Sequence, residues 1–92
     1  MKFGWDDRKA RANLRKHDIS FELATKAFED DHAIEELDDR EDYGEERQSL
    51  LGLADGVLVF VIFTIRGDRV RIISARKATS SEEISYYQND AF

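Results

Sequence analysis

Cationic side chains gather in one short stretch in the C-terminal third of this 92-residue chain. The guanidinium of arginine presents a planar fork of N–H donors that matches the oxygens of a phosphate. Several such forks near the edge of a sheet favour a polyanion, and RNA is the polyanion that we expect. Residues 66–77 contain, against the single acid Asp68, the cations Arg66, Arg69, Arg71, Arg76 and Lys77.

Cleavage of RNA without a metal needs a base for the 2′-hydroxyl, cations beside the developing phosphorane and an acid for the departing 5′-oxygen. Arg71 and Arg76 are the candidates for stabilising the phosphate charge. They have opposite parity on a regular strand, so both serve one site only if the strand twists, bulges or unwinds between them. His17 or Glu82 would carry the proton. The cations that would position the RNA backbone are Arg66, Lys77 and Lys9.

Each of these residues also has an ordinary structural interpretation. Every arginine could pair with an acid on a neighbouring strand or loop, as surface cations commonly do. His17 could close a helix and interact with its dipole. Phe3 and Trp5 are better explained as core anchors of a short strand than as platforms for RNA bases.

The net charge of −6 argues against a nucleic-acid partner, but the distribution of charge is uneven. Residues 8–17 carry five cations and no acid, whereas residues 22–46 carry twelve acids against Lys26 and Arg40. A chain so polarised could offer one face to phosphates and another to a basic partner.

Other kinds of site find no support in the sequence. There is no cysteine, His17 and His32 are isolated, and the carboxylates of 35–46 lack the spacing of a calcium loop. Phosphate loops rich in glycine and nucleophile elbows are also missing, so we expect neither a metal nor a cofactor. The apolar run 57–65 is far shorter than the ~20 residues of a membrane span, and no signal peptide is evident. A soluble, cytoplasmic protein is expected.

The apolar pattern predicts an α+β domain of order β-α-α-β-β-β-β-α, occupying residues 1–92 as a single unit. A short N-terminal strand precedes a helix over about 7–17, capped by Asp6 or Asp7 and closed by Asp18. Ser20 caps a second helix that ends near Glu29. The remaining elements are an edge strand near 33–37, a mobile loop over 38–46, a strand over 48–53, a hairpin turn at Asp55-Gly56, a central strand over 57–65 and a strand over 69–77.

A last short helix is predicted after residue 79, because two capping boxes overlap over 79–83. Its inward face is expected to carry Ile84 and Tyr87. Tyr86 would then project outward, as a solvated or partner-contacting ring.

The residues together resemble the BrnT family, toxins of type II toxin-antitoxin modules with a RelE-like ribonuclease fold. The similarity extends from Phe3 to about Tyr86, and the combination of motifs is highly specific. It depends on Trp5-Asp6 with Lys9 and Asn13, Lys16-His17, Ser20-Phe21-Glu22, Ala27-Phe28, Gly44-Glu45-Glu46-Arg47, Gly52, Thr64, Arg66-Gly67 and above all on the run from Arg71 to Ala78.

This resemblance implies a small toxin that cleaves RNA and arrests translation until an antitoxin, BrnA, wraps and blocks it. The antitoxin of the family carries the DNA-binding domain, so operator DNA would be bound only through the antitoxin. Because two antitoxin chains dimerise, an assembly of two toxins and two antitoxins is expected.

The chain departs from the family pattern at several positions. Asp18 stands where glycine is usual, Asp31 where proline is common, and Ser80, Ser81 and Glu83 where the final helix is often basic. Fewer cations there should weaken the attraction for phosphate. Two other functions therefore stay open: a non-catalytic module that caps a DNA-binding antitoxin as corepressor, and, less favoured, a domain for a small phosphorylated ligand.

Overall fold

The computed structural model describes residues 1–38 and 45–90. The elements follow in the order β1 (Lys2–Gly4), α1 (Asp7–His17), α2 (Phe21–Thr25), the 3₁₀ helix η1 (Lys26–Glu29), β2 (Ile34–Asp38), β3 (Arg47–Ala54), β4 (Val57–Arg66), β5 (Arg69–Lys77) and α3 (Ser80–Asp90). This order confirms the α+β class and the predicted succession of strands and helices. The loop expected over 38–46, and its mobility, fall largely on residues 39–44, which lie outside the described residues.

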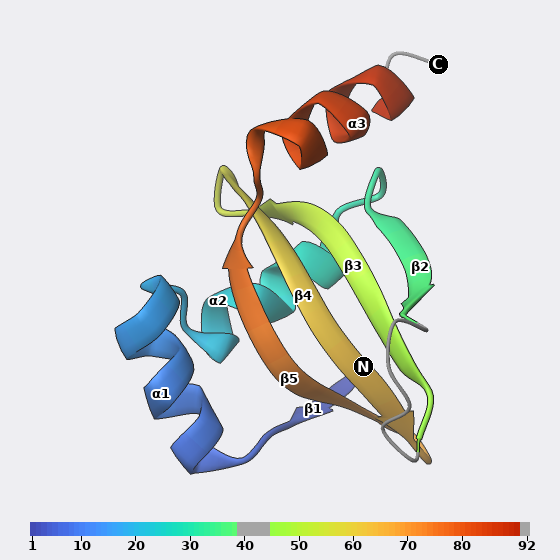
Figure 1. Ribbon diagram of the computed structural model, residues 1–92. Helices are drawn as coiled ribbons and strands as arrows, with labels where there is room; N and C mark the ends of the chain where they lie inside the picture. The colour runs from blue at the N-terminus through green and yellow to red at the C-terminus, as the bar shows by residue number, and fades with distance from the viewer. Residues whose placement is uncertain (39–44, 91–92) are drawn as a thin grey trace.

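The five strands form one sheet in the spatial order β1-β5-β4-β3-β2 (Figure 1). All neighbours are antiparallel except β1, which pairs in parallel with β5. β4 lies at the centre, as predicted from a run that is apolar on both faces. Asp55 and Gly56 join β3 to β4 with φ values of 49° and 81°. Positive φ at both positions is the signature of a type I′ turn, which confirms the predicted hairpin.

The predicted ends of the first two helices are also confirmed. The Asp6 carboxylate accepts hydrogen bonds from the backbone N–H groups of Arg8 and Lys9, at 2.8 and 3.1 Å. Asp18 ends α1 in the left-handed conformation with φ 58°. The Ser20 hydroxyl caps α2 by accepting from the Leu23 N–H at 3.0 Å. The helix then tightens into η1 and ends at Glu29, as expected.

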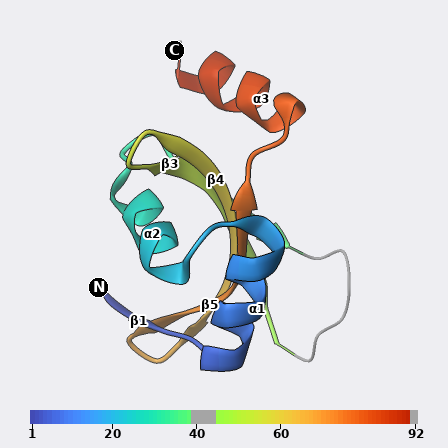
Figure 2. The same ribbon diagram turned by 90° about the vertical axis from the view of Figure 1, so that its left-hand side faces the viewer.

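Helix α2 and the 3₁₀ helix η1 cover one face of the sheet, whereas α1 lies beside the β5 edge, and together they border the main core (Figure 2). Phe3 and Trp5 belong to this core, because their rings pack edge-on against Phe28 and Phe21 with centroids 5.1 and 5.8 Å apart. Gly52 lets β3 approach the helical layer, since a Cβ there would lie 2.8 Å from the Ala27 carbonyl oxygen.

Asn13 fastens α1 to the edge of β5. Its amide is buried, and Nδ2 donates to the carbonyl oxygens of Ile19 and Ala75 at 3.0 and 2.7 Å. In return, the Ala75 N–H donates to Asn13 Oδ1 at 3.1 Å. The side chain therefore replaces a neighbouring strand at Ala75, beyond the end of the short β1.

α3 lies beyond the end of the sheet where β5 finishes (Figures 1 and 2). The prediction for its orientation was wrong: Tyr86 is 2 % exposed, whereas Ile84 and Tyr87 are 58 % and 54 % exposed. Because α3 crosses the end of the sheet instead of lying along a broad face, few of its side chains reach the interior. Tyr86 packs against Leu51 and Leu58 and its hydroxyl donates to the Asp30 carboxylate.

Candidate active site

The face of the sheet turned away from α2 and η1, here called the outer face, carries the candidate site. Its members follow from the strand register, in which side chains alternate between faces. Phe60 and Thr64 of β4 lie on it, since Val61 and Phe63 between them belong to the helix-covered core. Across the strands, Phe60 pairs with Leu51 and Arg76, and Thr64 pairs with Arg71.

A β-bulge in β5 brings Arg71 and Arg76 onto this same face. Ile62 pairs with Ser74 whereas Phe63 pairs with Ile72, so Ile73 is the extra residue in the ladder. One extra residue reverses the alternation beyond it. The condition that the sequence sets for these two arginines to share a site is therefore met. Their partners on β4 are four positions apart, which corresponds to roughly 13 Å along the strand.

Arg76 is held in a defined position by two neighbours. Its Nη1 and Nη2 donate to the two carboxylate oxygens of Glu82 at 2.8 and 3.0 Å, a bidentate pair. The guanidinium lies 4.4 Å from the centroid of the Phe60 ring, the geometry of a cation–π contact. The position of Arg76 therefore depends on both β4 and the first turn of α3.

Glu82 takes part in two interactions at once. It completes a capping box, because its carboxylate accepts from the Thr79 N–H at 2.9 Å while the Thr79 hydroxyl accepts from the Glu82 N–H at 3.2 Å. The hydrogen bonds from Arg76, against an opposing effect of burial, hold the pKa of Glu82 below its usual 4.5. Glu82 is therefore a carboxylate at neutral pH.

A pocket of about 200 Å³ separates the outer face from α3. Phe60 and Glu82 both line it. Two carboxylates and three hydroxyls reach it, from Glu36, Glu82, Ser49, Ser81 and Ser85. This polar lining can hydrogen-bond to a ligand, although its only charges are negative.

Arg71 lies on the outer face farther from α3 than Arg76 does, and beside the start of α1. It pairs with Gly4 of β1, next to the Asp6 cap. The pKa of Asp6 is lowered first by the hydrogen bond from the Lys9 N–H, and also by the charges of Lys9 and Arg71. Arg71 and Lys9 thus both lie near Asp6, in a second group that is separate from Arg76.

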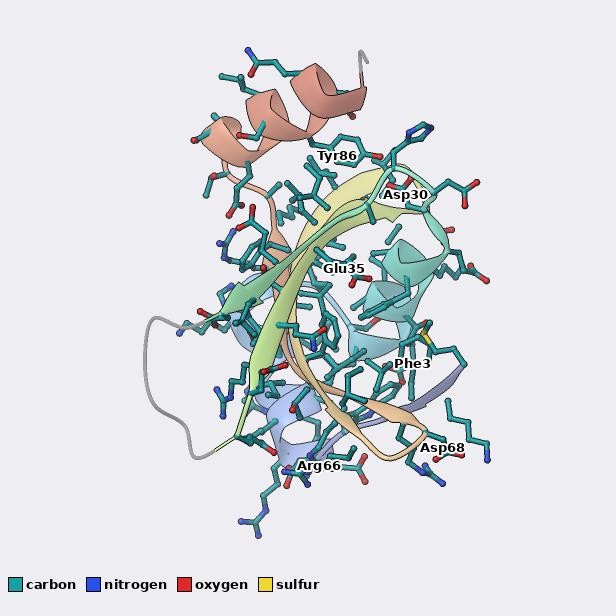
Figure 3. The ribbon with its side chains drawn as sticks, turned by 90° about the vertical axis from the view of Figure 1, so that its right-hand side faces the viewer. Phe3, Asp30, Glu35, Arg66, Asp68 and Tyr86 are labelled. Atoms are coloured by element: carbon teal, nitrogen blue, oxygen red, sulfur yellow. The ribbon has the colours of Figure 1, made fainter. Side chains whose placement is uncertain are left out.

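The other predicted cations lie apart. Arg66 is at the end of the sheet opposite to Tyr86 (Figure 3), where its Nη2 is 3.2 Å from the Glu45 carboxylate. Lys77 is exposed at the end of β5 and has the parity opposite to that of Arg76, since it pairs with the core residue Val59. His17 is the last residue of α1 and is half-buried. Among the predicted site residues, the structure places Arg76 and Glu82 in direct contact.

Three contributors were missed by reasoning from sequence. Phe60 was assigned only to the apolar central strand, although its alternation with Val61 could have placed it on the second face. Glu36 was read as part of an acidic segment. The sequence marks Asn13 only within the resemblance to the BrnT family, because a buried amide at a helix-to-edge junction leaves no distinct local signal.

Two further findings concern the described part of the chain. Within residues 1–38 and 45–90, no three histidines or carboxylates come together as a metal site. None of the helices in these ranges combines the length and the apolar character needed to cross a bilayer.

Comparison with known proteins identifies one family. The curated proteins contain no match to this chain. Residues 5–82 match the family model described as ribonuclease toxin, BrnT, of type II toxin-antitoxin system. This match covers most of the 92 residues, including every strand from β2 to β5 and the first turn of α3. The chain therefore belongs to the BrnT family of ribonuclease toxins of type II toxin-antitoxin systems.

Proposed function

We propose that this ribonuclease toxin cleaves RNA without a metal ion, in the cytoplasm, and thereby arrests translation and growth. The observation that carries the proposal is the bulge in β5, which turns Arg71 and Arg76 to one face of the sheet. A bulge beside a functional residue commonly serves to re-aim a side chain.

Arg76 would stabilise the scissile phosphate. In the cleavage step the 2′-oxygen forms a new bond to phosphorus, the bond from phosphorus to the 5′-oxygen breaks, and negative charge grows on the phosphoryl oxygens. Hydrogen bonds from a fixed cation are most effective when they are aimed at this developing charge. Arg76 donates three of its five N–H groups, to Glu82 and to the Lys77 carbonyl, which leaves donors for phosphate oxygens.

Arg71 would bind a flanking phosphate, because a backbone separation of roughly 13 Å is long for contact with the same phosphate as Arg76. Lys9, whose charge also acts on Asp6, would extend the same track. Arg66, at the end of β4, and Lys77, at the end of β5, would hold more distant parts of the RNA.

Proton transfer would fall to His17 or Glu82. Glu82 is ionised at neutral pH, so it can accept a proton from the 2′-hydroxyl but has none to give to the 5′-oxygen. Its bidentate bond to Arg76 also gives it a positioning role. His17 is the candidate donor.

Membership in a type II system implies an antitoxin. We propose a BrnA-like protein in this role, in an assembly of two toxins and two antitoxins that contacts operator DNA only through the antitoxin.

Induced expression without the antitoxin tests this function. We expect growth arrest accompanied by fragmented RNA in cells that carry the parent chain. Arg76→Ala should lower the cleavage rate by about 100-fold, equivalent to ~3 kcal/mol of transition-state stabilisation. Healthy growth and intact RNA with the parent chain would contradict the proposal.

A second candidate function is favoured by the acids of the site. Glu82 pairs with Arg76, and Glu36 adds another negative charge to the adjacent pocket. A chain whose key cation is neutralised could act as a non-catalytic corepressor that caps its antitoxin. It would then leave RNA intact yet increase the affinity of the antitoxin for operator DNA in a gel-shift titration.

A further inference from the structure

The strand β2 forms one edge of the sheet and offers its backbone to a partner. It pairs with β3 over five residues, and no strand of the described residues pairs with its outer side. Figure 3 views the molecule from this edge. An edge strand presents a row of N–H and C=O groups that can template another strand. The opposite edge, β1, is only three residues long.

The side chains of β2 carry a chemical preference. Leu37 is 57 % exposed, a large apolar side chain between Glu36 and Asp38. Glu35 lies on the same face as Leu37, and Glu36 lies on the other face, because side chains alternate along a strand. Both carboxylates are exposed, and Glu35 is labelled in Figure 3. The edge therefore exposes one large apolar side chain and carries negative charge on both faces.

These charges distinguish between possible occupants. A second copy of β2 would bring carboxylates close to carboxylates across a two-fold axis, and facing like charges destabilise a strand pair. A strand with lysine or arginine on both faces would instead gain a favourable cross-strand partner at each carboxylate. A shallow hollow of about 230 Å³ beside Glu35, Glu36, Leu37 and Gln48 leaves room for such side chains.

We propose that the antitoxin adds an extended, basic segment to the outer edge of β2 and so continues the sheet by one strand. The segment would place an apolar side chain beside Leu37 and cations beside Glu35 and Glu36. Main-chain hydrogen bonds would supply affinity and the charged pairs would supply specificity. This inference rests on the antitoxin partner in the proposed function, and it does not depend on whether the toxin cleaves RNA.

Amide hydrogen exchange on the complex with the cognate antitoxin tests the added strand directly. Edge amides that point outward exchange readily until they find an acceptor. We expect exchange within residues 34–38 to slow by at least about tenfold when the antitoxin binds. Protection that appears elsewhere, with residues 34–38 unchanged, would overturn the proposal.

A charge variant provides the second measurement. Glu35→Lys combined with Leu37→Lys should raise the dissociation constant of the antitoxin by about tenfold or more, because it sets cations against cations. The matched control is Glu22→Lys combined with Leu14→Lys, which changes an exposed acid and an exposed leucine on the helical side. The control should bind like the parent. An edge variant with parental affinity would refute the added strand.

The same variants separate this inference from the proposed function. The edge variant should cleave RNA at the parental rate, since Glu35 and Leu37 lie outside the candidate site. If no variant cleaves RNA while the edge variant still loses its antitoxin, the nuclease proposal fails and the added strand stands.

Discussion

Asn13 shows how much of the site depends on one buried amide. Its amide pairs with both the N–H and the carbonyl group of Ala75, the residue before Arg76. Because the amide is buried, water cannot replace these hydrogen bonds. An unsatisfied buried polar group costs more free energy than the hydrogen bond itself contributes. The Asn13 side chain therefore fixes the backbone of β5 immediately before Arg76, and so helps to orient Arg76 on the outer face.

Replacing Asn13 by alanine should lower the free energy of unfolding by about 2–3 kcal/mol, since the Ala75 N–H and two carbonyl groups lose their partner. Urea denaturation measures this loss. The control is Arg15→Ala on the exposed side of α1, which should change stability by less than about 0.5 kcal/mol. Equal effects of the two substitutions would contradict the bridging role of Asn13.

Glu82→Gln tests the bidentate pair and its pH dependence. At neutral pH we expect a loss of about 1–2 kcal/mol in the free energy of unfolding, because charge-assisted bonds to Arg76 are replaced by weaker ones. The folded-state pKa of Glu82 is lowered, so the stabilisation is complete above about pH 4.5 and is lost as the pH falls through the folded value. Denaturation of parent and variant at pH 7 and pH 3 should show the difference narrowing at the lower pH. Glu83→Gln, an exposed neighbour, should show neither effect.

At the scale of elements, Gly52 sets the distance between β3 and the helical layer. A Cβ at this position would meet the Ala27 carbonyl oxygen at 2.8 Å and the Ala33 Cβ at 3.2 Å. Because backbone atoms cannot move aside as the end of a flexible side chain can, Gly52→Ala should lower the free energy of unfolding by about 1–3 kcal/mol. Gly4→Ala is the control, because its nearest neighbour would be 4.0 Å away. Thermal unfolding of the two variants measures the contrast, and similar melting temperatures would argue against close packing at Gly52.

Tyr86 is the main anchor of α3. Tyr86→Phe removes the hydrogen bond to Asp30, whose carboxylate also accepts from the Leu53 and His32 N–H groups. We expect a loss of about 1–2 kcal/mol and faster amide exchange within α3. Tyr87→Phe should leave both unchanged, since Tyr87 is exposed. If the two variants exchange at the same rate, Tyr86 is not the anchor.

The elements were predictable from sequence where local rules decide them. Caps at Asp6 and Ser20, the Asp55-Gly56 turn and the apolar run of β4 each follow from neighbouring residues alone. The inward side of α3 did not follow, because it depends on where Asp30 stands, 56 residues earlier in the chain. The sequence makes a bulge between Arg71 and Arg76 a condition for a shared site, but no local signal places it at Ile73, because its position is set by pairing with β4.

At the scale of the whole molecule, the predicted cations divide by position. Arg76 and Glu82 meet at the α3 end of the outer face, Arg71 and Lys9 lie beside the start of α1, and Arg66 lies at the opposite end of the sheet. The types of these residues were sufficient to predict that they bind phosphate, but only the fold shows where each of them lies. The acid-rich edge at β2 lies across the sheet from α1 and its basic run, so the charge separation seen in sequence is also a separation in space.

The most direct test of the account is cleavage of a single-stranded RNA by the purified chain in the presence of a chelator. We expect products that end in a 2′,3′-cyclic phosphate and a 5′-hydroxyl. Arg76→Ala should lower kcat by about 100-fold, Arg71→Ala should act mainly on KM, and Arg15→Ala should match the parent. Uncleaved RNA with the parent chain, or parental kcat in Arg76→Ala, would contradict the account.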